Sequence, residues 1–205
     1  MRQEQRKSWN REYRLRGKLW RGELKEKDIF EENLVPGMVL DNGCGNGKGT
    51  PKIPNVIGMD FSVFALSLYE SNTKVLGDMV HLPFKDSTFS NILFIHSLDH
   101  LNRDERDSAL QEAGRVLKED GIVIARVFSR MDFRYRKGHE IEEGTFLRGN
   151  RIQTHYFEKE EFSGSSVFKV SKTYDINYTV NIQNKKYNRR EFIIILTKSK
   201  SGNIR

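Results

Sequence analysis

The chain has 205 residues, of which 37% are hydrophobic and 31% charged, and this composition suits one folded domain. Its single cysteine excludes an internal disulfide framework and any zinc or iron–sulfur site built from several cysteines. The polar, basic start of the chain and the lack of an apolar run of about 18 residues predict neither a signal peptide nor a membrane span, and hence a cytoplasmic protein.

The net charge of +7 is unevenly distributed along the chain. Residues 1–22 carry 8 basic and 2 acidic side chains, residues 163–205 carry 9 and 2, and the segment between them is acidic overall. Two basic ends are compatible with an anionic partner such as RNA or a phosphorylated metabolite. Solvated faces of an ordinary domain give the same pattern more often, so the charge alone selects no partner.

Strand-like and helix-like segments alternate over the first two thirds of the chain. After a helical N-terminal region, the apolar run 38–41 stops at a glycine cluster, as a buried parallel strand does. The pattern then predicts, in order, a strand at 56–60, a helix at 61–70, strands at 74–78 and 91–96, a helix at 104–117 and a strand at 122–127. Repeated units of this kind imply an α/β fold with a doubly wound, mostly parallel sheet and a ligand site at the carboxyl ends of its first strands.

The last third of the chain is less regular. Residues 130–149 are charged and punctuated by glycine, which predicts a loop or an insert. Residues 167–180 alternate apolar and polar side chains, as a half-exposed strand does. The run 192–196 is too apolar for a sheet edge and predicts a late strand inserted within the sheet.

A glycine-rich turn follows the first predicted strand. Gly43, Gly45 and Gly47 alternate after Asp41. A dinucleotide-binding loop of the form G-x-G-x-x-G would need glycine where this chain has Lys48. A pyrophosphate gains nothing from the Asp41 carboxylate, whereas a cationic amino acid is attracted to it. The loop therefore favours a ligand with a cationic amino-acid part.

The strand and loop from Val39 to Gly47 resemble the cofactor loop of class I S-adenosylmethionine-dependent methyltransferases (type 11-like), in which a strand ends in D-x-G-x-G-x-G. The resemblance covers residues 39–128 and implies a Rossmann-like sheet with helices on both faces and an antiparallel late strand. It implies S-adenosylmethionine as the cofactor and no metal. Residues 1–205 would form one domain, with a helical lid segment (1–36), a cofactor-binding half (37–128) and an acceptor-side insert with late strands (129–205).

The same resemblance assigns roles to residues at the ends of the predicted strands. Asp60 would accept hydrogen bonds from both ribose hydroxyls, and Phe61 would flank the adenine. Asp78 would accept the adenine amino group, and His96 would line the methionine part through its backbone. Each aspartate alone fits a helix cap or a turn equally well, but their recurrence at successive strand ends points to one site. The expected cofactor-binding residues are Tyr13, Trp20, Asp41, Gly43, Cys44, Gly45, Asp60, Phe61, Gly77, Asp78, Met79 and His96.

Methyl transfer is an in-line displacement at an activated sulfonium carbon, so alignment matters more than any universal catalytic residue. Asp99 and His100 follow the fourth strand and are the expected catalytic pair, because they are the candidates nearest the expected methyl position. His100 fits a packed or capping role at least as well. His155 and Tyr156 would line either the acceptor pocket or an aromatic core patch.

The segment 9–22 mixes aromatic and basic residues, a composition that also suits RNA. We expect it to form a docked helix with partial lid function, with Tyr13 and Trp20 closing over the methionine end of the cofactor. A docked helix with merely solvated arginines is the alternative. Cys44 is expected to fill space in the loop rather than act as a nucleophile.

Only eight residues, 48–55, separate the glycine loop from the next strand, and two of them are prolines, which discourage a helix. This short crossover, the loop 43–48 and the helix start 104–106 are similar to methyltransferases that esterify carboxymethyluridine at the tRNA wobble position. That family has two adjacent histidines where this chain has Asp99 and His100. This difference weakens the inference that the chain shares that family's substrate, but it does not affect the inference of a shared cofactor.

The sequence therefore predicts an S-adenosylmethionine-dependent methyltransferase with an unidentified small-molecule or protein acceptor. The alternative is a tRNA methyltransferase that acts on a wobble uridine and contacts RNA through the basic termini. A third interpretation is a catalytically silent cofactor-binding subunit of a partner protein. No membrane partner is expected.

Overall fold

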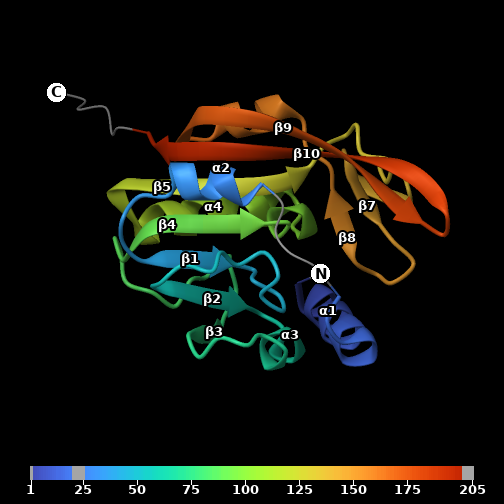
Figure 1. The fold of residues 1–205 in the computed structure, drawn as a ribbon, viewed down its shortest axis with the longest axis horizontal. Helices are drawn as coiled ribbons and strands as arrows, with labels where there is room; N and C mark the ends of the chain where they lie inside the picture. The colour runs from blue at the N-terminus through green and yellow to red at the C-terminus, as the bar shows by residue number, and fades with distance from the viewer. Residues whose placement is uncertain (1, 20–25, 200–205) are drawn as a thin grey trace.

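A seven-stranded sheet runs through the molecule (Figure 1). The computed structural model describes residues 2–19 and 26–199. The strands of this sheet are β1 (Val39–Asn42), β2 (Val56–Asp60), β3 (Lys74–Leu76), β4 (Phe89–Ile95), β5 (Leu117–Phe128), β9 (Phe168–Ile182) and β10 (Lys185–Lys198). They lie in the order β3-β2-β1-β4-β5-β10-β9. Strand β10 runs antiparallel to both of its neighbours, β5 and β9, and the other pairs are parallel. The predicted α/β fold with an antiparallel late strand is confirmed.

The helices of the first half agree with the predicted pattern apart from their length. Ser62 caps α3 (Val63–Ser67) by accepting a hydrogen bond from the amide of Ala65 at 3.1 Å. The helix is shorter than the predicted segment. Beyond its end, the ring of Tyr69 packs beside Gly47 and Gly58, where a Cβ at either glycine would collide with it. No helix is described between β1 and β2, as the short crossover predicts.

Helix α4 (Arg103–Val116) begins with a reciprocal capping box formed by Asn102 and Glu105. Strand β5 begins directly after it at Leu117, earlier than predicted, with an irregular register against β4.

Helices cover both faces of the sheet. Helix α4 packs Ala109 and Ala113 into the larger core cluster, and neither side chain is exposed. On the other face, α2 (Lys27–Asn33) packs the fully buried Phe30 against β1, β4 and β10. Burying a phenylalanine side chain contributes roughly 1.5–3 kcal/mol, so Phe30 helps to hold α2 against the sheet.

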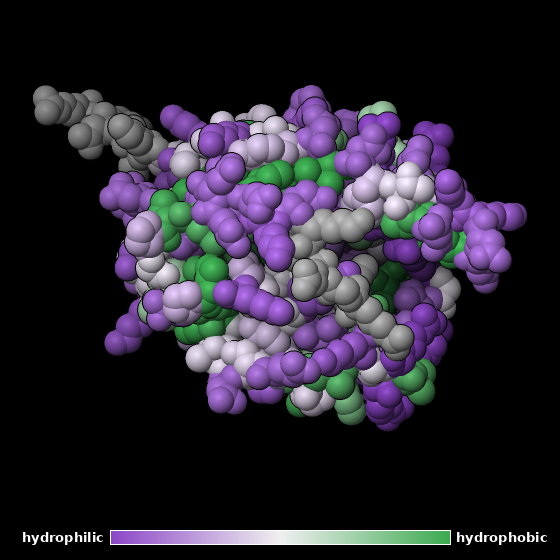
Figure 2. Space-filling view, in the orientation of Figure 1, coloured by the Kyte–Doolittle hydropathy of each residue, from purple (hydrophilic) through white to green (hydrophobic). Residues whose placement is uncertain are grey.

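The two late strands lie where the sequence places them. Strand β10 lies between β5 and β9, and its run from Ile193 to Leu196 is buried. Strand β9 forms the sheet edge, with exposed positions along most of its length. Figure 2 shows that the face of the molecule seen in Figure 1 is mainly hydrophilic, with hydrophobic residues gathered in small areas.

Of the two alternatives predicted for 130–149, a loop or an insert, the structure shows an insert, because part of this segment forms a second sheet. Strands β6 (His139–Glu142), β7 (Thr145–Leu147) and β8 (Gln153–His155) pair antiparallel, in the order β6-β7-β8. Strands of three or four residues are too short to show an alternating pattern, and β6 is largely exposed and charged. This insert is followed by the 3-10 helix η2 (Lys159–Gly164).

Helix α1 (Arg2–Arg16) lies beside the carboxyl ends of β1 and β2 (Figure 1). It ends at Gly17, which has a left-handed backbone with φ of 66° and donates a hydrogen bond to the carbonyl of Tyr13. None of the described helices is both long enough and apolar enough to cross a membrane.

Candidate active site

A cavity of about 420 Å³ opens at the carboxyl ends of the parallel strands, between the glycine loop and α1. This is where an open α/β sheet binds its ligand, and the volume suits a small molecule. The expected residues that line it are Tyr13, Asp41, Gly43, Cys44, Gly45, Asp60, Phe61, Gly77, Met79, His96 and His100. Trp20 lies outside the described residues, and Asp78 and Asp99 do not line the cavity.

The glycine loop is held against the end of β2 by backbone hydrogen bonds. The amides of Gly43 and Cys44 donate to the carbonyl of Met59 at 2.8 and 2.9 Å. A Cβ at Gly43 would collide with Ser97, and one at Gly45 would lie 2.5 Å from the hydroxyl of Tyr13. Both glycines also have positive φ values, so the loop can pass this close only without side chains.

Two buried carboxylates lie on either side of this loop. Asp41 is 1% exposed and accepts a hydrogen bond from the hydroxyl of Thr50, and Asp60 is 8% exposed. Asp60 accepts hydrogen bonds from the amides of Gly45 at 2.9 Å and Ser62 at 2.8 Å. Within the described ranges, no lysine or arginine forms an ion pair with either carboxylate.

Burial raises the pKa of Asp41 to about 7, with a smaller contribution from the charge of Asp60. Burial also raises the pKa of Asp60 to about 6, although the amides that donate to it act in the opposite direction. Two desolvated carboxylates give this part of the cavity a negative potential. A ligand that carries a sulfonium and an ammonium group would compensate this negative potential.

Helix α1 forms one side of the cavity, next to the glycine loop. The buried Tyr13 lines it, and burial together with the Asp60 charge raises the pKa of its phenol, which therefore stays neutral. Trp9, one turn earlier, also lines the cavity and contacts the ring of His100 edge-on, with ring centroids 4.8 Å apart. Helix α1 therefore borders the cavity, and its function as a lid stays a prediction.

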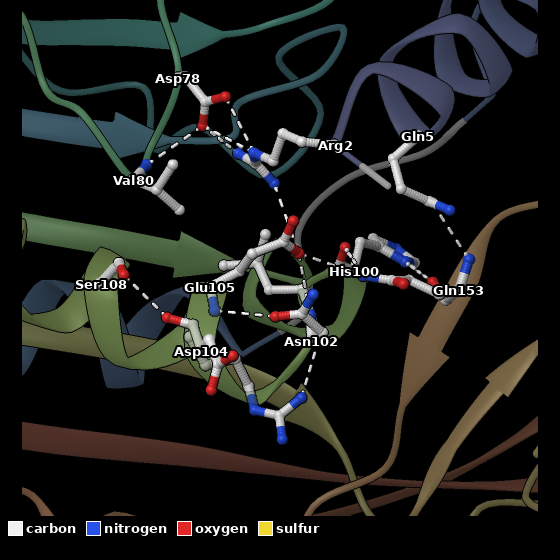
Figure 3. A network of polar contacts seen from close by, with 12 residues as sticks. Arg2, Gln5, Asp78, Val80, His100, Asn102, Asp104, Glu105, Ser108 and Gln153 are labelled. Atoms are coloured by element: carbon white, nitrogen blue, oxygen red, sulfur yellow. Dashed lines mark hydrogen bonds and ion pairs between the residues drawn. The ribbon is translucent and has the colours of Figure 1, made fainter. Parts of the chain in front are cut away.

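Arg2 is a site residue that the sequence did not predict. Its guanidinium pairs with the Asp78 carboxylate and lies over the ring of Phe61, 5.3 Å from the centroid. Figure 3 shows Arg2 reaching from α1 to Asp78 beyond β3, with Glu105 of α4 on its other side. The cation of Arg2 lowers the pKa of Asp78 against its partial burial. Arg2 therefore lies between the two residues to which the resemblance assigns the adenine.

The expected catalytic pair is divided between two environments. Asp99 is fully buried behind the cavity wall, where it accepts a 2.6 Å hydrogen bond from the amide of Phe128. Its pKa is raised well above the usual range by burial, so it is a structural acceptor rather than the expected cavity-facing base. The placement expected for Asp99 is thus corrected: its position just beyond β4 turns the side chain into the core.

His100 does line the cavity. Its Nδ1 lies 2.8 Å from the carbonyl oxygen of Gln153, and only a protonated Nδ1 can donate to that acceptor. Burial lowers the pKa of His100 to about 4, so the ring is neutral and Nε2 carries a lone pair. That buried Nε2 has no hydrogen-bond partner in the part of the chain that the structure describes.

His96 occupies the end of β4 in a left-handed backbone conformation, with φ of 54°. Its amide donates to the carbonyl of Arg126, and its ring stacks on Phe128 with centroids 4.4 Å apart. Burial lowers the pKa of His96, against the charge of Glu191, which lies 3.5 Å from its Nε2.

His155 and Tyr156 belong to the interior of the insert and not to the cavity wall. His155 contacts Thr145 and Glu161 through its two ring nitrogens at 2.7 and 2.8 Å. Tyr156 is fully buried in an aromatic cluster with Phe128 and Phe146. Of the two alternatives that the sequence left open, the structure supports the core patch.

The far wall of the cavity contains residues that sequence reasoning missed. Arg126 lies on β5, Arg189 and Glu191 lie on β10, and Arg134 lies in the segment between β5 and β6. They are far apart in the chain and follow no motif. The pairing of β10 with β5 brings Arg126 and Glu191 close to each other.

The comparisons with known proteins agree with this geometry. Residues 40–125, which span β1 to β5, match the family described as "Methyltransferase domain". This matched segment, which is less than half of the chain, is similar to that family. The glycine loop with its two buried carboxylates fits S-adenosylmethionine, the cofactor that this similarity implies.

Curated relatives cover part of the chain. An uncharacterized protein of Methanocaldococcus jannaschii is 33% identical over 117 residues, which is 55% of this chain and 45% of that protein. A tRNA N(3)-cytidine methyltransferase of Danio rerio is 26% identical over 181 residues, 75% of this chain and 51% of that protein. The chain spans about half the length of these relatives.

A solved structure shows that the fold extends beyond the matched segment. The Burkholderia thailandensis 1,6-didemethyltoxoflavin-N1-methyltransferase, crystallised with bound 1,6-didemethyltoxoflavin and S-adenosylhomocysteine, superposes with a TM-score of 0.67 at 16% identity. The superposition covers 95% of this chain and 87% of that one.

The buried charge of Asp41 should destabilise the cofactor-free protein. Because its folded-state pKa of about 7 exceeds the usual 3.8, folding favours the protonated form, and stability is lost as pH rises from 4 through 7. We expect Asp41→Asn to raise the free energy of unfolding at pH 8 by at least about 1 kcal/mol, measured by urea denaturation. The gain should shrink towards pH 4, where Asp41 is neutral in both states. Equal stability of the two proteins at pH 8 would contradict the assignment, and Asp107→Asn on the exposed side of α4 is the control.

Asp60 should control cofactor affinity. We expect Asp60→Ala to weaken the binding of S-adenosylhomocysteine at least tenfold, or about 1.4 kcal/mol, because a charge-assisted contact to the ribose is lost. Titration calorimetry measures this effect, with Asp107→Ala as the matched control and a denaturation curve to verify folding. Unchanged affinity in a folded Asp60→Ala protein would mean that the ribose binds elsewhere.

Proposed function

We propose that the protein is an S-adenosylmethionine-dependent methyltransferase that acts on a small-molecule or protein acceptor. The observation that carries this proposal is the pair of buried carboxylates, Asp41 and Asp60, beside the glycine loop. At Gly43 and Gly45, this loop has no room for a side chain. A cytoplasmic location is part of the proposal and is supported by the free, buried Cys44, the only cysteine in the chain.

Some residues of the cavity would bind the cofactor, and others would align the acceptor. Asp60 would hold the ribose, and Asp41 would lie beside the cationic amino-acid part of the cofactor. When bound, the cofactor supplies an activated methyl group on a sulfonium sulfur. Tyr13 and Trp9 would exclude water from above, which strengthens electrostatic interactions within the cavity.

His100 would orient the acceptor. Its Nε2 lone pair can accept a hydrogen bond from an acceptor N–H or O–H, and so fixes the direction of the attacking lone pair. A ring with a pKa of about 4 is a weak base, so alignment contributes more than proton abstraction. If the acceptor atom is already anionic, no base is required.

A tRNA acceptor is the second candidate. It is supported by the similarity to the Danio rerio tRNA methyltransferase and by exposed basic side chains on α1, namely Arg6, Lys7, Arg11 and Arg14. If RNA binds there, its affinity should fall steeply with salt concentration, because each phosphate contact releases counterions.

A transfer assay tests the function. The protein is incubated with S-adenosylmethionine labelled in the methyl group, together with either a metabolite extract, a protein extract or unmodified tRNA, and the label is located by chromatography and mass spectrometry. We expect label in the metabolite or protein fraction, reduced at least tenfold by Asp60→Ala. Label in tRNA alone would support the second candidate. Binding of S-adenosylhomocysteine without transfer to any acceptor would support the silent-subunit interpretation and contradict the proposed function.

A further inference from the structure

Three arginines line the far wall of the cavity, but they differ in their partners. Arg126 pairs with Glu191 at 2.7 Å and with Glu26 at 2.9 Å. Arg189 pairs with Asp132 at 3.3 Å and with Glu191 at 3.1 Å. The guanidinium of Arg134 forms no ion pair with any carboxylate in residues 2–19 or 26–199.

The carboxylates near Arg134 are already used by other groups. Asp132 accepts from the backbone amide of Arg134 through one oxygen, and from Arg189 and the amide of Arg190 through the other. Glu191 also accepts from the hydroxyl of Tyr178 at 2.9 Å. The local network therefore offers Arg134 no further carboxylate oxygen of its own.

The position of Arg134 is costly for an unpaired cation. The side chain is half-buried against the ring of Phe133, 5.3 Å from the centroid. Burial and the nearby charges of Arg189 and Arg148 lower its pKa, and the charge of Asp132 opposes this shift without reversing it. A half-buried cation repelled by two others is unfavourable unless an anion compensates it.

We infer that Arg134 binds an anionic group, a carboxylate or a phosphate, on a small acceptor substrate. This inference rests on the proposed function, because it places the acceptor in the cavity that also contains the cofactor residues. A guanidinium can hold either anion through two parallel hydrogen bonds, which fixes orientation as well as position.

The placement of the arginine relative to His100 gives the site its selectivity. Arg134 and His100 line the same cavity, and the proposed acceptor would contact both. The anionic group would anchor the acceptor at Arg134, while His100 Nε2 orients the atom to be methylated. Acceptors without an anionic group would lose this anchor and lie less well aligned.

A cavity of about 420 Å³ favours a small molecule over a polymer at this position. The exposed arginines of α1 lie on a different element, so RNA binding there would not require Arg134.

The test uses the full chain saturated with S-adenosylhomocysteine. Inorganic phosphate and malonate are titrated separately at constant ionic strength, and the melting temperature is followed. We expect at least one of the two anions to raise it with a saturable dependence, and the arm that responds distinguishes a phosphate from a carboxylate acceptor.

Arg134→Gln should weaken this response at least tenfold, and Arg134→Lys should restore part of it. Arg136→Gln is the matched control, because Arg136 is exposed two residues further along the same segment. Without added anion, Arg134→Gln should be at least as stable as the wild type, since an uncompensated charge is removed. A structural role would instead lower the melting temperature in the absence of anion.

The possible failures can be told apart. If S-adenosylhomocysteine does not bind the wild type, the proposed function fails. If it binds equally to the wild type and Arg134→Gln, and the two proteins respond identically to both anions, the inference about Arg134 is wrong while the proposed function stands. The inference is equally wrong if only tRNA binding depends on Arg134.

Discussion

The site depends first on the carboxylate of Asp60 at the end of β2. One oxygen accepts from Gly45 in the loop after β1, and the other accepts from Ser62 at the start of α3. A single buried charge thus joins three elements that the chain separates, and it does so through backbone amides that no side-chain substitution would remove. Because hydrogen bonds to a charged group are strong, the loop is held in shape before any ligand binds.

This arrangement is unfavourable in one respect, because it removes the negative charge of Asp60 from water. The nearby charge of Asp41, which is also buried, adds to this cost. If these side chains only had to accept hydrogen bonds from the backbone, neutral groups would do so equally well. The raised pKa values of both groups therefore point to a site that gives up stability in order to attract a cation.

The rest of the cavity is assembled from parts of the chain that lie far apart. Helix α1 is fixed to the insert by Gln5, whose amide donates to the carbonyl of Arg151 at 3.0 Å and accepts from the amide of Gln153. Gln153 in turn accepts from His100 (Figure 3). Helix α1, the insert and His100 therefore form one connected network. A displacement of α1 would disturb Arg2 and Tyr13 at the cofactor end and His100 at the acceptor end together.

The sequence predicted those features that local patterns encode. The strand ends, the glycine loop and the positions of Asp41 and Asp60 follow from hydrophobic runs and spacing. The pairing of Arg2 with Asp78 and the arginines of the far wall could not be predicted, because they depend on tertiary contacts between segments that carry no motif. Asp99 shows the opposite error: its chain position suggested the cavity, but its side chain turns into the core and binds the backbone of β5.

Hydrogen–deuterium exchange of the full chain, with and without S-adenosylhomocysteine, tests the central claim most directly. The account predicts slower exchange in the glycine loop, at the end of β2 and along α1, since all three border the same cavity. Exchange at β6, which lies apart from the cavity lining, should stay unchanged. Binding accompanied by protection elsewhere, with the loop and α1 unaffected, would contradict the account.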